Sequence, residues 1–177
     1  MPRRVASRVI VIIMGVLGAG KTTIGVLLAE QLGSQFIDAD SFHSAGNIEK
    51  MRRGVPLTDE DRRPWLEAIQ RAIAGWLCAR RNVVLACSAL KSSYRDKLHI
   101  HNNEVKLVYI RATYQLILAR LQGRHGHFAG QRLVASQFAD LEEPSDAIVV
   151  DAACAPQEIV KQIRLSLATI RGRPASP

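Results

Sequence analysis

One segment constrains the fold of this chain more than any other: residues 15–22 have the sequence GVLGAGKT. It matches the G-x-x-x-x-G-K-[ST] pattern of a phosphate-binding loop at every fixed position. An apolar, β-branched run over residues 8–14 precedes it and predicts a buried parallel strand. A helical pattern over residues 23–32 follows, and Gly33 is placed to end that helix. This order predicts a strand–loop–helix unit that binds phosphate groups at the helix N-terminus.

The loop predicts contacts with a nucleoside triphosphate. Its glycines let backbone N–H groups surround phosphate oxygens, and the positive end of the helix dipole adds to the attraction. We expect Lys21 to reach the β- and γ-phosphates and the Thr22 hydroxyl to hold Mg²⁺. The alternative, a chance glycine-rich turn, is improbable because all the specified positions occur in the right context. The predicted ATP-binding residues are Gly15, Val16, Leu17, Gly18, Ala19, Gly20, Lys21, Thr22 and Thr23.

The rest of the chain alternates predicted strands with predicted helices. Further strands are expected at residues 35–38, 82–87, 105–110 and 147–151. Helices are expected at 65–80, with Pro64 at the first position, at 114–122, at 133–141 and from Pro156 onward. This alternation predicts an α/β fold, in which a parallel sheet carries helices on both faces. The length of 177 residues favours a single domain over 1–177, with a mobile loop at 123–130 and a frayed tail at 171–177.

Composition narrows the class of partner. The formal net charge is +8, but the basic residues are scattered and aromatic residues make up only 5% of the chain, so we expect no nucleic-acid ligand. A protein that binds polyanionic ATP and a second anion explains this charge equally well.

Residues 1–17 resemble a secretion signal, but cleavage there would remove the strand that leads into the phosphate loop. Three cysteines without metal-ligand spacing, and no apolar run of about 20 residues, predict a cytoplasmic protein that does not enter a membrane.

Two carboxylates follow the second predicted strand. Asp38 and Asp40 lie two residues apart at its carboxyl end, where ligands collect in open α/β sheets. Both can face a metal ion and an acceptor hydroxyl, and a solvated Asx-rich turn is the alternative. The adjacent phosphate loop favours the functional interpretation. A basic cluster of Lys50, Arg52 and Arg53 comes next, and an anionic acceptor would need such groups.

Two arginines lie at the edge of the predicted mobile loop. Arg120 and Arg124 are four residues apart, so they share one helix face and repel each other unless an anion lies nearby. We expect them to close over the phosphates of ATP, with a solvated basic helix end as the alternative. His125 and His127 have no third metal ligand nearby in the sequence, which favours lid packing or phosphate contact over zinc binding. Cys87 is expected to be a buried structural thiol.

Several longer blocks, spread from the phosphate loop to Asp151, resemble the gluconokinase family. These blocks are Asp38-Ala-Asp40 followed by His43, Asn47, Lys50-Met51, Gly54 and Pro56-Leu57, then Asp59-x-Asp61-Arg62, Pro64-Trp65-Leu66, Cys87-Ser-Ala-Leu-Lys91, Tyr94-Arg95-Asp96, Gly126-His-Phe128, Ser136-Gln-Phe138 and Leu141-Glu142-x-Pro144. The resemblance implies a P-loop kinase similar to shikimate and adenylate kinases, a three-layer sandwich with strand order 2-3-1-4-5 and a mobile lid. It also implies ATP-dependent phosphorylation of D-gluconate to 6-phospho-D-gluconate, and a homodimer. Leu17 and Ala19 depart from the family, which often has Ser at both positions.

The resemblance further implies direct in-line transfer of the γ-phosphoryl group to the terminal hydroxyl of gluconate. Lys21 and the loop amides hold the phosphates, Thr22 and Asp38 position Mg²⁺, and Asp40 orients the hydroxyl and takes its proton. The acceptor would bind in a helical region at about 41–80, and a lid at about 123–135 would exclude water. The expected catalytic residues are Lys21, Asp40, Arg120 and Arg124.

The acceptor itself requires groups for a carboxylate and for hydroxyls. Arg53 is expected to bind the carboxylate, because a guanidinium binds it through two hydrogen bonds. The full set of expected acceptor-binding residues is Asp40, His43, Arg53, Lys91 and His127. Two alternatives stay open: a kinase for another small polyol acid or a nucleotide, and a regulatory ATP-binding module without catalysis. The chain lacks an Asn-Lys-x-Asp guanine-binding motif, which speaks against a GTPase.

Overall fold

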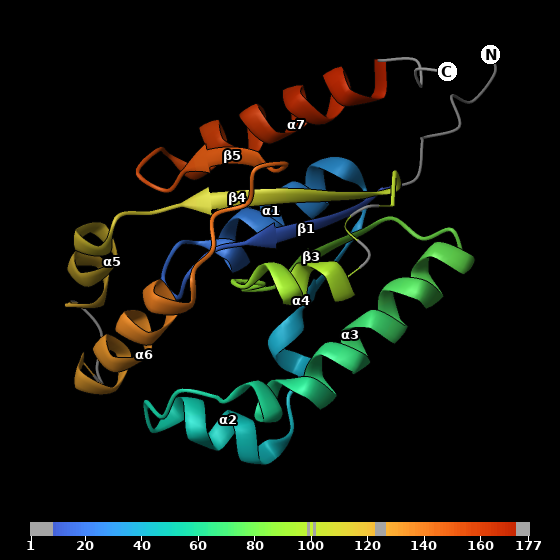
Figure 1. The fold of residues 1–177 in the computed structure, drawn as a ribbon. Coiled ribbons are helices and arrows are strands. Elements are labelled where there is room, and N and C mark those ends of the chain that lie inside the picture. Colours follow the sequence, from blue (N-terminus) through green and yellow to red (C-terminus); the bar gives the residue numbers. More distant parts are fainter. Residues whose placement is uncertain (1–8, 99, 101, 123–126, 173–177) are drawn as a thin grey trace.

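The computed structural model describes residues 9–98, 100, 102–122 and 127–172 (Figure 1). Within these residues, a parallel sheet of five strands has the order β2-β3-β1-β4-β5. The strands are β1 (Ile10–Met14), β2 (Gln35–Asp38), β3 (Val83–Ala86), β4 (Val105–Arg111) and β5 (Ile148–Asp151). The expected strand order of 2-3-1-4-5 is confirmed.

The central strand β1 brings the functional segments together. All five of its residues are buried, as its apolar and β-branched sequence predicts. It pairs in parallel with β3 on one side and with β4 on the other. Parallel pairing puts the carboxyl ends of the strands at one edge of the sheet, and β2 ends there at Asp38, opposite Ala86 of β3. The phosphate loop, the carboxylates after β2 and the loop after β3 therefore meet at this edge.

Helices cover both faces of the sheet. They are α1 (Lys21–Leu32), the 3₁₀ helix η1 (Ala39–Phe42), α2 (Ala45–Arg52), α3 (Asp59–Cys78), α4 (Ser92–Lys97), α5 (Tyr114–Leu121), α6 (His127–Asp140) and α7 (Pro156–Gly172). On one face, α1, α5 and α7 pack on strand residues such as Val11 and Ile13. On the other face, α3 and α4 pack on Ile10 and Ile12, so α3 and α7 lie on opposite sides in Figure 1. The three-layer architecture is confirmed. Among the described residues, no helix is long and apolar enough to cross a membrane.

Helix α3 begins earlier than the sequence pattern predicts. Its first residue is Asp59, whereas the pattern places Pro64 at the first position. The Thr58 hydroxyl accepts a hydrogen bond from the Asp61 N–H at 3.2 Å, and the Asp61 carboxylate accepts one from the Thr58 N–H at 3.0 Å. This capping box stabilises the first turn. Pro64 therefore lies inside the helix, where it removes one backbone hydrogen bond without ending the helix.

Other boundaries differ for simple reasons. Helix α4 was not expected, because six residues are too few to show a helical period. Helix α6 begins at His127 rather than at Leu133, so the described part of the expected lid at 123–135 is helical. Helix α7 continues to Gly172, two residues into the expected tail. Residue 8 of the first expected strand, residues 123–126 of the expected lid and residues 173–177 of the tail lie outside the described residues.

Candidate active site

Glycines shape the loop between β1 and α1. Gly15, Gly18 and Gly20 have φ angles of 153°, 80° and 105°, which L side chains rarely adopt. A Cβ atom added at Gly15 would also lie 2.9 Å from the carbonyl oxygen of Ile110. Within the described residues no side chain caps α1 at Gly20, which leaves the N–H groups of its first turn for an anion. The loop is therefore suited to phosphate oxygens, which approach the backbone closely.

Lys21 lies beside this loop at the first position of α1. Its Nζ donates a hydrogen bond to the carbonyl oxygen of Val16 at 3.0 Å. Burial lowers the pKa of Lys21, and the nearby Asp40 carboxylate is the main charge that opposes this shift. A desolvated ammonium beside helix N–H groups strongly favours an anionic partner.

Thr22 and Asp38, the expected metal ligands, are brought together. The Thr22 hydroxyl donates to Asp38 Oδ2 at 3.3 Å. Hard oxygen ligands suit Mg²⁺, which usually takes its remaining ligands from water and substrate phosphates. No group of three or more His, Cys, Asp or Glu side chains that could hold a metal ion occurs in the part of the chain that the structure describes. The donor set therefore fits an ion that arrives with a nucleotide better than a permanently bound metal.

Asp38 also fixes the position of Asp40. Its Oδ1 accepts a hydrogen bond from the Asp40 N–H at 3.0 Å, which caps η1. Desolvation and then the neighbouring Asp38 carboxylate raise the pKa of Asp40, while Lys21 lowers it. A carboxylate with a raised pKa is a stronger base, and the backbone of Asp40 is held independently of its side chain.

A cavity of about 480 Å³ opens beside these residues, within the usual range for small-molecule sites. The phosphate loop, η1, α2, α3, the loop after β3, α4 and α6 contribute to its wall. Its polar lining residues are Lys21, Asp38, Asp40, His43, Arg62, Ser88, Tyr94, Ser136 and Gln137. The others are mostly apolar and include Leu17, Met51, Trp65, Leu90 and Leu133.

A second cavity, of about 350 Å³, includes the other part of the phosphate loop. Its lining residues are Gly18, Ala19, Gly20, Thr23, Ile24, Arg120, Ala152, Cys154, Pro156 and Ile159. The Arg120 guanidinium donates to the carbonyl oxygens of Gly18 at 3.1 Å, Ala19 at 3.3 Å and Ala152 at 2.6 Å. Arg120 therefore joins the phosphate loop to the loop between β5 and α7. The two cavities are lined by different residues of the phosphate loop, so the loop can contribute to both.

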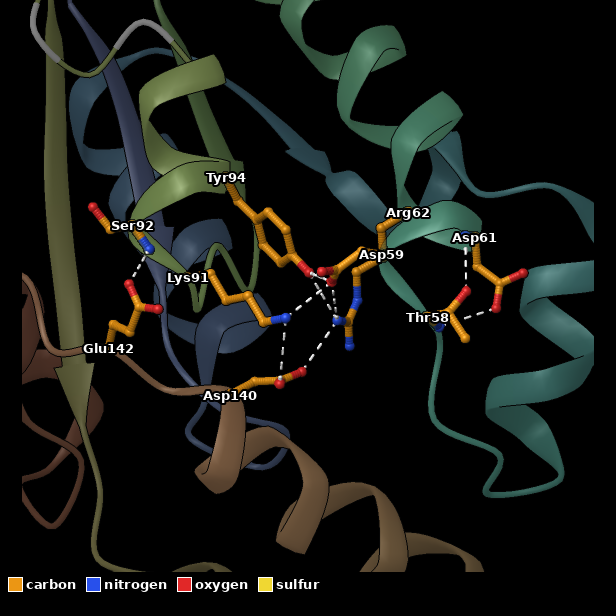
Figure 2. Close-up of polar contacts among 9 residues, drawn as sticks. All are labelled: Thr58, Asp59, Asp61, Arg62, Lys91, Ser92, Tyr94, Asp140 and Glu142. Carbon is orange, nitrogen blue, oxygen red and sulfur yellow. Dashed lines mark hydrogen bonds and ion pairs between the residues drawn. The ribbon is translucent and has the colours of Figure 1, made fainter.

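Figure 2 shows a polar cluster that includes Arg62 and Tyr94, both of which line the first cavity. Arg62 Nη1 donates to Tyr94 Oη at 3.0 Å and to Asp140 Oδ2 at 3.1 Å. Lys91 Nζ donates to Asp59 Oδ1 at 2.9 Å, and Tyr94 Oη also donates to Asp59. Asp140 ends α6, where the helix dipole disfavours a negative charge, and Arg62 and Lys91 compensate it. This cluster fixes the last turn of α6 to α3 and α4.

The predicted acceptor-binding residues lie in different surroundings. Asp40 and His43 line the first cavity, whereas Lys91 belongs to the polar cluster and is not among the lining residues. Arg53 is exposed at the end of α2 and does not line that cavity either. His127 is the first residue of α6, but its side chain lies outside the described part of the structure.

The remaining predicted residues can also be located. Arg124 lies outside the described residues. Lys50 of the basic cluster is paired with Asp61 at 2.7 Å, and Arg52 with Glu49 at 2.9 Å. Cys87 is buried, and burial raises the pKa of its thiol to about 12, so the thiol stays protonated as a structural residue does.

Several residues of the site, Ser88 and Ser136 of the cavity wall among them, were not singled out from the sequence, and four of the others make polar contacts between elements. They are Arg62 and Tyr94 in the cavity wall, Gln137 on α6, whose Oε1 accepts from the Leu17 N–H at 2.7 Å, and Asp140. The first three lie within the blocks that resemble the gluconokinase family, and this membership was the one sequence signal that could have pointed to them. Asp140 lies outside those blocks, and only the packing of α6 against α3 gives it a partner.

The chain resembles several known proteins. Residues 17–168 match the shikimate kinase family model. The thermosensitive gluconokinase of Escherichia coli (strain K12) is 40% identical over 164 residues, which cover 90% of this chain and 88% of that protein. The probable gluconokinase of Dictyostelium discoideum is 41% identical over 169 residues, covering 88% and 84%. A crystal structure of a gluconokinase from Sinorhizobium meliloti 1021 has a TM-score of 0.80 and 36% identity, over 94% of this chain and 99% of that one.

Proposed function

The chain belongs to the gluconokinase family, and from this we propose that it transfers the γ-phosphoryl group of ATP to D-gluconate, forming 6-phospho-D-gluconate and ADP. One observation carries the proposal: Lys21 of the phosphate loop and Asp40 line the same cavity. Their charges interact, since Asp40 is the main charge that opposes the lowered pKa of Lys21. A phosphate held by Lys21 and a hydroxyl held by Asp40 would meet at one end of this cavity.

The proton and the phosphate would be handled by separate groups. We assign Asp40 as the base that orients the acceptor hydroxyl and takes its proton, because its raised pKa favours proton uptake. Lys21 and the loop N–H groups would hold the transferred phosphate in line with that hydroxyl. Thr22 and Asp38 would hold Mg²⁺, which neutralises charge on the phosphates when bound.

Arg62 is a better candidate than Arg53 for the acceptor carboxylate. It lines the cavity, and its side chain is only 14% exposed, so its charge is weakly screened. Its guanidinium is oriented by Tyr94 and Asp140, which reduces the entropy lost when an anion binds. An arginine with fixed orientation can bind a carboxylate through two hydrogen bonds. Arg53, by contrast, is exposed and lies outside the cavity wall.

The second cavity is assigned to the nucleoside part of ATP. It shares the phosphate loop with the first cavity, and Pro156 and Ile159 give it an apolar wall suited to a base. Arg120 lies between the two loops that border it, in a position to neutralise charge on the phosphates. The role of Arg124 in the same step stays a prediction.

Three further expectations stay predictions: dependence on Mg²⁺, which rests on Thr22 and Asp38, a homodimer, which rests on the family resemblance, and a cytoplasmic location, which rests on the cysteines and the lack of a long apolar run. Removal of Mg²⁺ by a chelator is expected to abolish ADP release. Light scattering coupled to size-exclusion chromatography is expected to give a mass twice that of the 19.5-kDa chain. The cysteines Cys78, Cys87 and Cys154 are free thiols, which suits a reducing compartment.

An ADP-release assay with a panel of acceptors tests the proposed function. The panel contains gluconate, other sugar acids, shikimate, uncharged polyols and nucleoside monophosphates, each at equal concentration with ATP and Mg²⁺. We expect gluconate to give the highest kcat/KM, with 6-phospho-D-gluconate as the product. Preference for another acceptor would reassign the substrate. ATP binding without any acceptor-dependent turnover would identify a regulatory module and refute the proposal.

A further inference from the structure

His43 lies in the wall of the first cavity with its ring plane fixed. It follows η1, and its imidazole stacks on the Trp65 indole with a centroid distance of 4.5 Å and an interplanar angle of 6°. The indole cannot turn freely, because its Nε1–H donates to the carbonyl oxygen of Ala39 at 2.7 Å and the residue is buried. The orientation of the imidazole is therefore determined by packing before any ligand binds.

The neighbouring side chain of Asn47 has only one possible orientation. Asn47 is buried, and its amide nitrogen lies 2.7 Å from the backbone carbonyl oxygen of Asp61. A carbonyl oxygen only accepts hydrogen bonds, so the amide atom that faces it must be Nδ2 and not Oδ1. The same Nδ2 lies 3.5 Å from Nδ1 of His43. The atom facing Nδ1 is therefore a donor, and Nδ1 must offer a lone pair.

The charge state of the ring is consistent with this geometry. Burial and then the positive charge of Arg62 lower the pKa of His43 to about 4. The imidazole is therefore neutral near pH 7 and carries one proton. Since Nδ1 faces the Asn47 donor, this proton is on Nε2. Nε2 is also the ring nitrogen left for a ligand in the cavity that His43 lines.

We propose that Asn47 is a positioning residue that holds His43 as the Nε2–H tautomer, and that His43 donates a hydrogen bond from Nε2 to an oxygen of the acceptor. This inference rests on the proposed function, because it describes how that site recognises its acceptor. It gives His43 a binding role and excludes it as the base: Nδ1 is occupied by Asn47, and Nε2 already carries a proton. It also predicts selection for acceptors with an oxygen lone pair at this point, supplied by a hydroxyl or by a carboxylate.

The tautomer is tested by ¹⁵N NMR of the full chain labelled at histidine, with no acceptor present. The His43 signals among those of the 5 histidines are assigned by their loss in His43→Gln. We expect an unprotonated Nδ1 and a protonated Nε2 from pH 7 down to about pH 5. In Asn47→Asp a carboxylate faces Nδ1, and we expect a proton on Nδ1. A protonated Nδ1 in the wild-type protein, or an unchanged tautomer in Asn47→Asp, overturns the proposal. Asn103→Asp makes the same chemical change at an exposed position and controls for charge.

The donor role is tested by kinetics with gluconate. The side-chain amide of Gln reaches the region of Nε2, whereas that of Asn reaches the region of Nδ1. We expect His43→Gln to keep kcat/KM within about threefold of wild type and His43→Asn to lose about tenfold, the size of one hydrogen bond. Equal losses of kcat/KM in His43→Gln and His43→Asn overturn the donor role of His43. This comparison does not depend on whether Asn47→Asp folds. Parallel NMR titrations with gluconate and with the uncharged polyol sorbitol distinguish the two possible partners of Nε2. If the partner is a carboxylate, gluconate shifts the Nε2 signal and sorbitol does not. If the partner is a hydroxyl, both ligands shift it. A wild-type protein without gluconate-dependent ADP release refutes the proposed function but leaves the NMR test of the tautomer intact.

Discussion

Replacing Asp40 by Asn separates catalysis from stability at one position. Asn has the same shape but cannot take a proton, so the step assigned to Asp40 loses its base. General-base catalysis contributes about 10²–10⁴ in rate, and we expect kcat to fall by that factor. The fold is expected to persist, because the Asp40 N–H donates to Asp38 whatever side chain it carries. ATP affinity is expected to stay within about tenfold, since Lys21 and the loop still bind the phosphates.

The same substitution is expected to increase stability. The folded state raises the pKa of Asp40 through desolvation and the Asp38 carboxylate. A carboxyl whose pKa is higher in the folded state than in the unfolded state destabilises the fold once it is ionised. A neutral Asn at this position removes the penalty, so the melting temperature at pH 7 should rise, and the gain should shrink as the pH falls towards the pKa of the carboxyl.

Three measurements on purified protein test this reasoning. ADP release gives kcat and KM with gluconate, calorimetric titration gives the dissociation constant of ATP, and thermal unfolding gives the melting temperature at pH 7 and pH 4. Asp146→Asn is the matched control, because Asp146 is exposed and does not line the first cavity. Unchanged kcat in Asp40→Asn would refute the base assignment. Equal losses of kcat and ATP affinity would instead place Asp40 in nucleotide binding, and a lower melting temperature at pH 7 would refute the electrostatic argument.

The remaining predictions concern three other groups. Lys21→Ala is expected to abolish ADP release while circular dichroism stays unchanged, and wild-type turnover in this variant would contradict the assignment of the loop. Asp140→Asn removes the negative charge that pairs the end of α6 with Arg62. We therefore expect the free energy of unfolding to fall by about 1–2 kcal/mol and the melting temperature to fall by roughly 2–8 °C. Glu158→Gln makes the same kind of change at an exposed ion pair with Lys161 and is its control. An equal effect of the two variants would contradict a structural role of the cluster. The pKa of His43 is about 4 in the folded protein and near 6.5 when exposed, so the unfolded chain takes up this proton first. The stability that neutral His43 contributes is thus fully present above pH 6.5 and is lost as the pH falls towards 4. Urea unfolding measures the free energy of unfolding at pH 7 and at pH 5. Between these two pH values it should fall less in His43→Gln than in wild type, and an equal fall would contradict the lowered pKa of His43.

The sequence by itself determined the parts of this protein that depend on local order. The phosphate loop is a continuous segment whose glycines and Lys21 must occur at fixed spacing, so its position and chemistry could be predicted. Buried parallel strands are nearly continuous apolar runs, which located β1, β3 and β4 within a residue or two. The less buried strands β2 and β5 were located equally well from their shorter apolar stretches. The carboxylates Asp38 and Asp40 followed from their place at a strand end. The family-like blocks added the strand order, which local patterns cannot supply.

Only the tertiary structure decided which polar side chains share the cavity. The sequence favoured Arg53 for the acceptor carboxylate, but α3 begins at Asp59 through its capping box, and the fold places Arg62 and not Arg53 in the cavity wall. Asp140 gains its partners because α6 packs beside α3 and α4, a contact between residues 78 positions apart. The orientation of Asn47, and with it the proton on His43, depends on one backbone carbonyl of another helix. Such contacts join distant segments through packing, so no local spacing encodes them, whereas the phosphate loop carries its phosphate-binding groups within one segment.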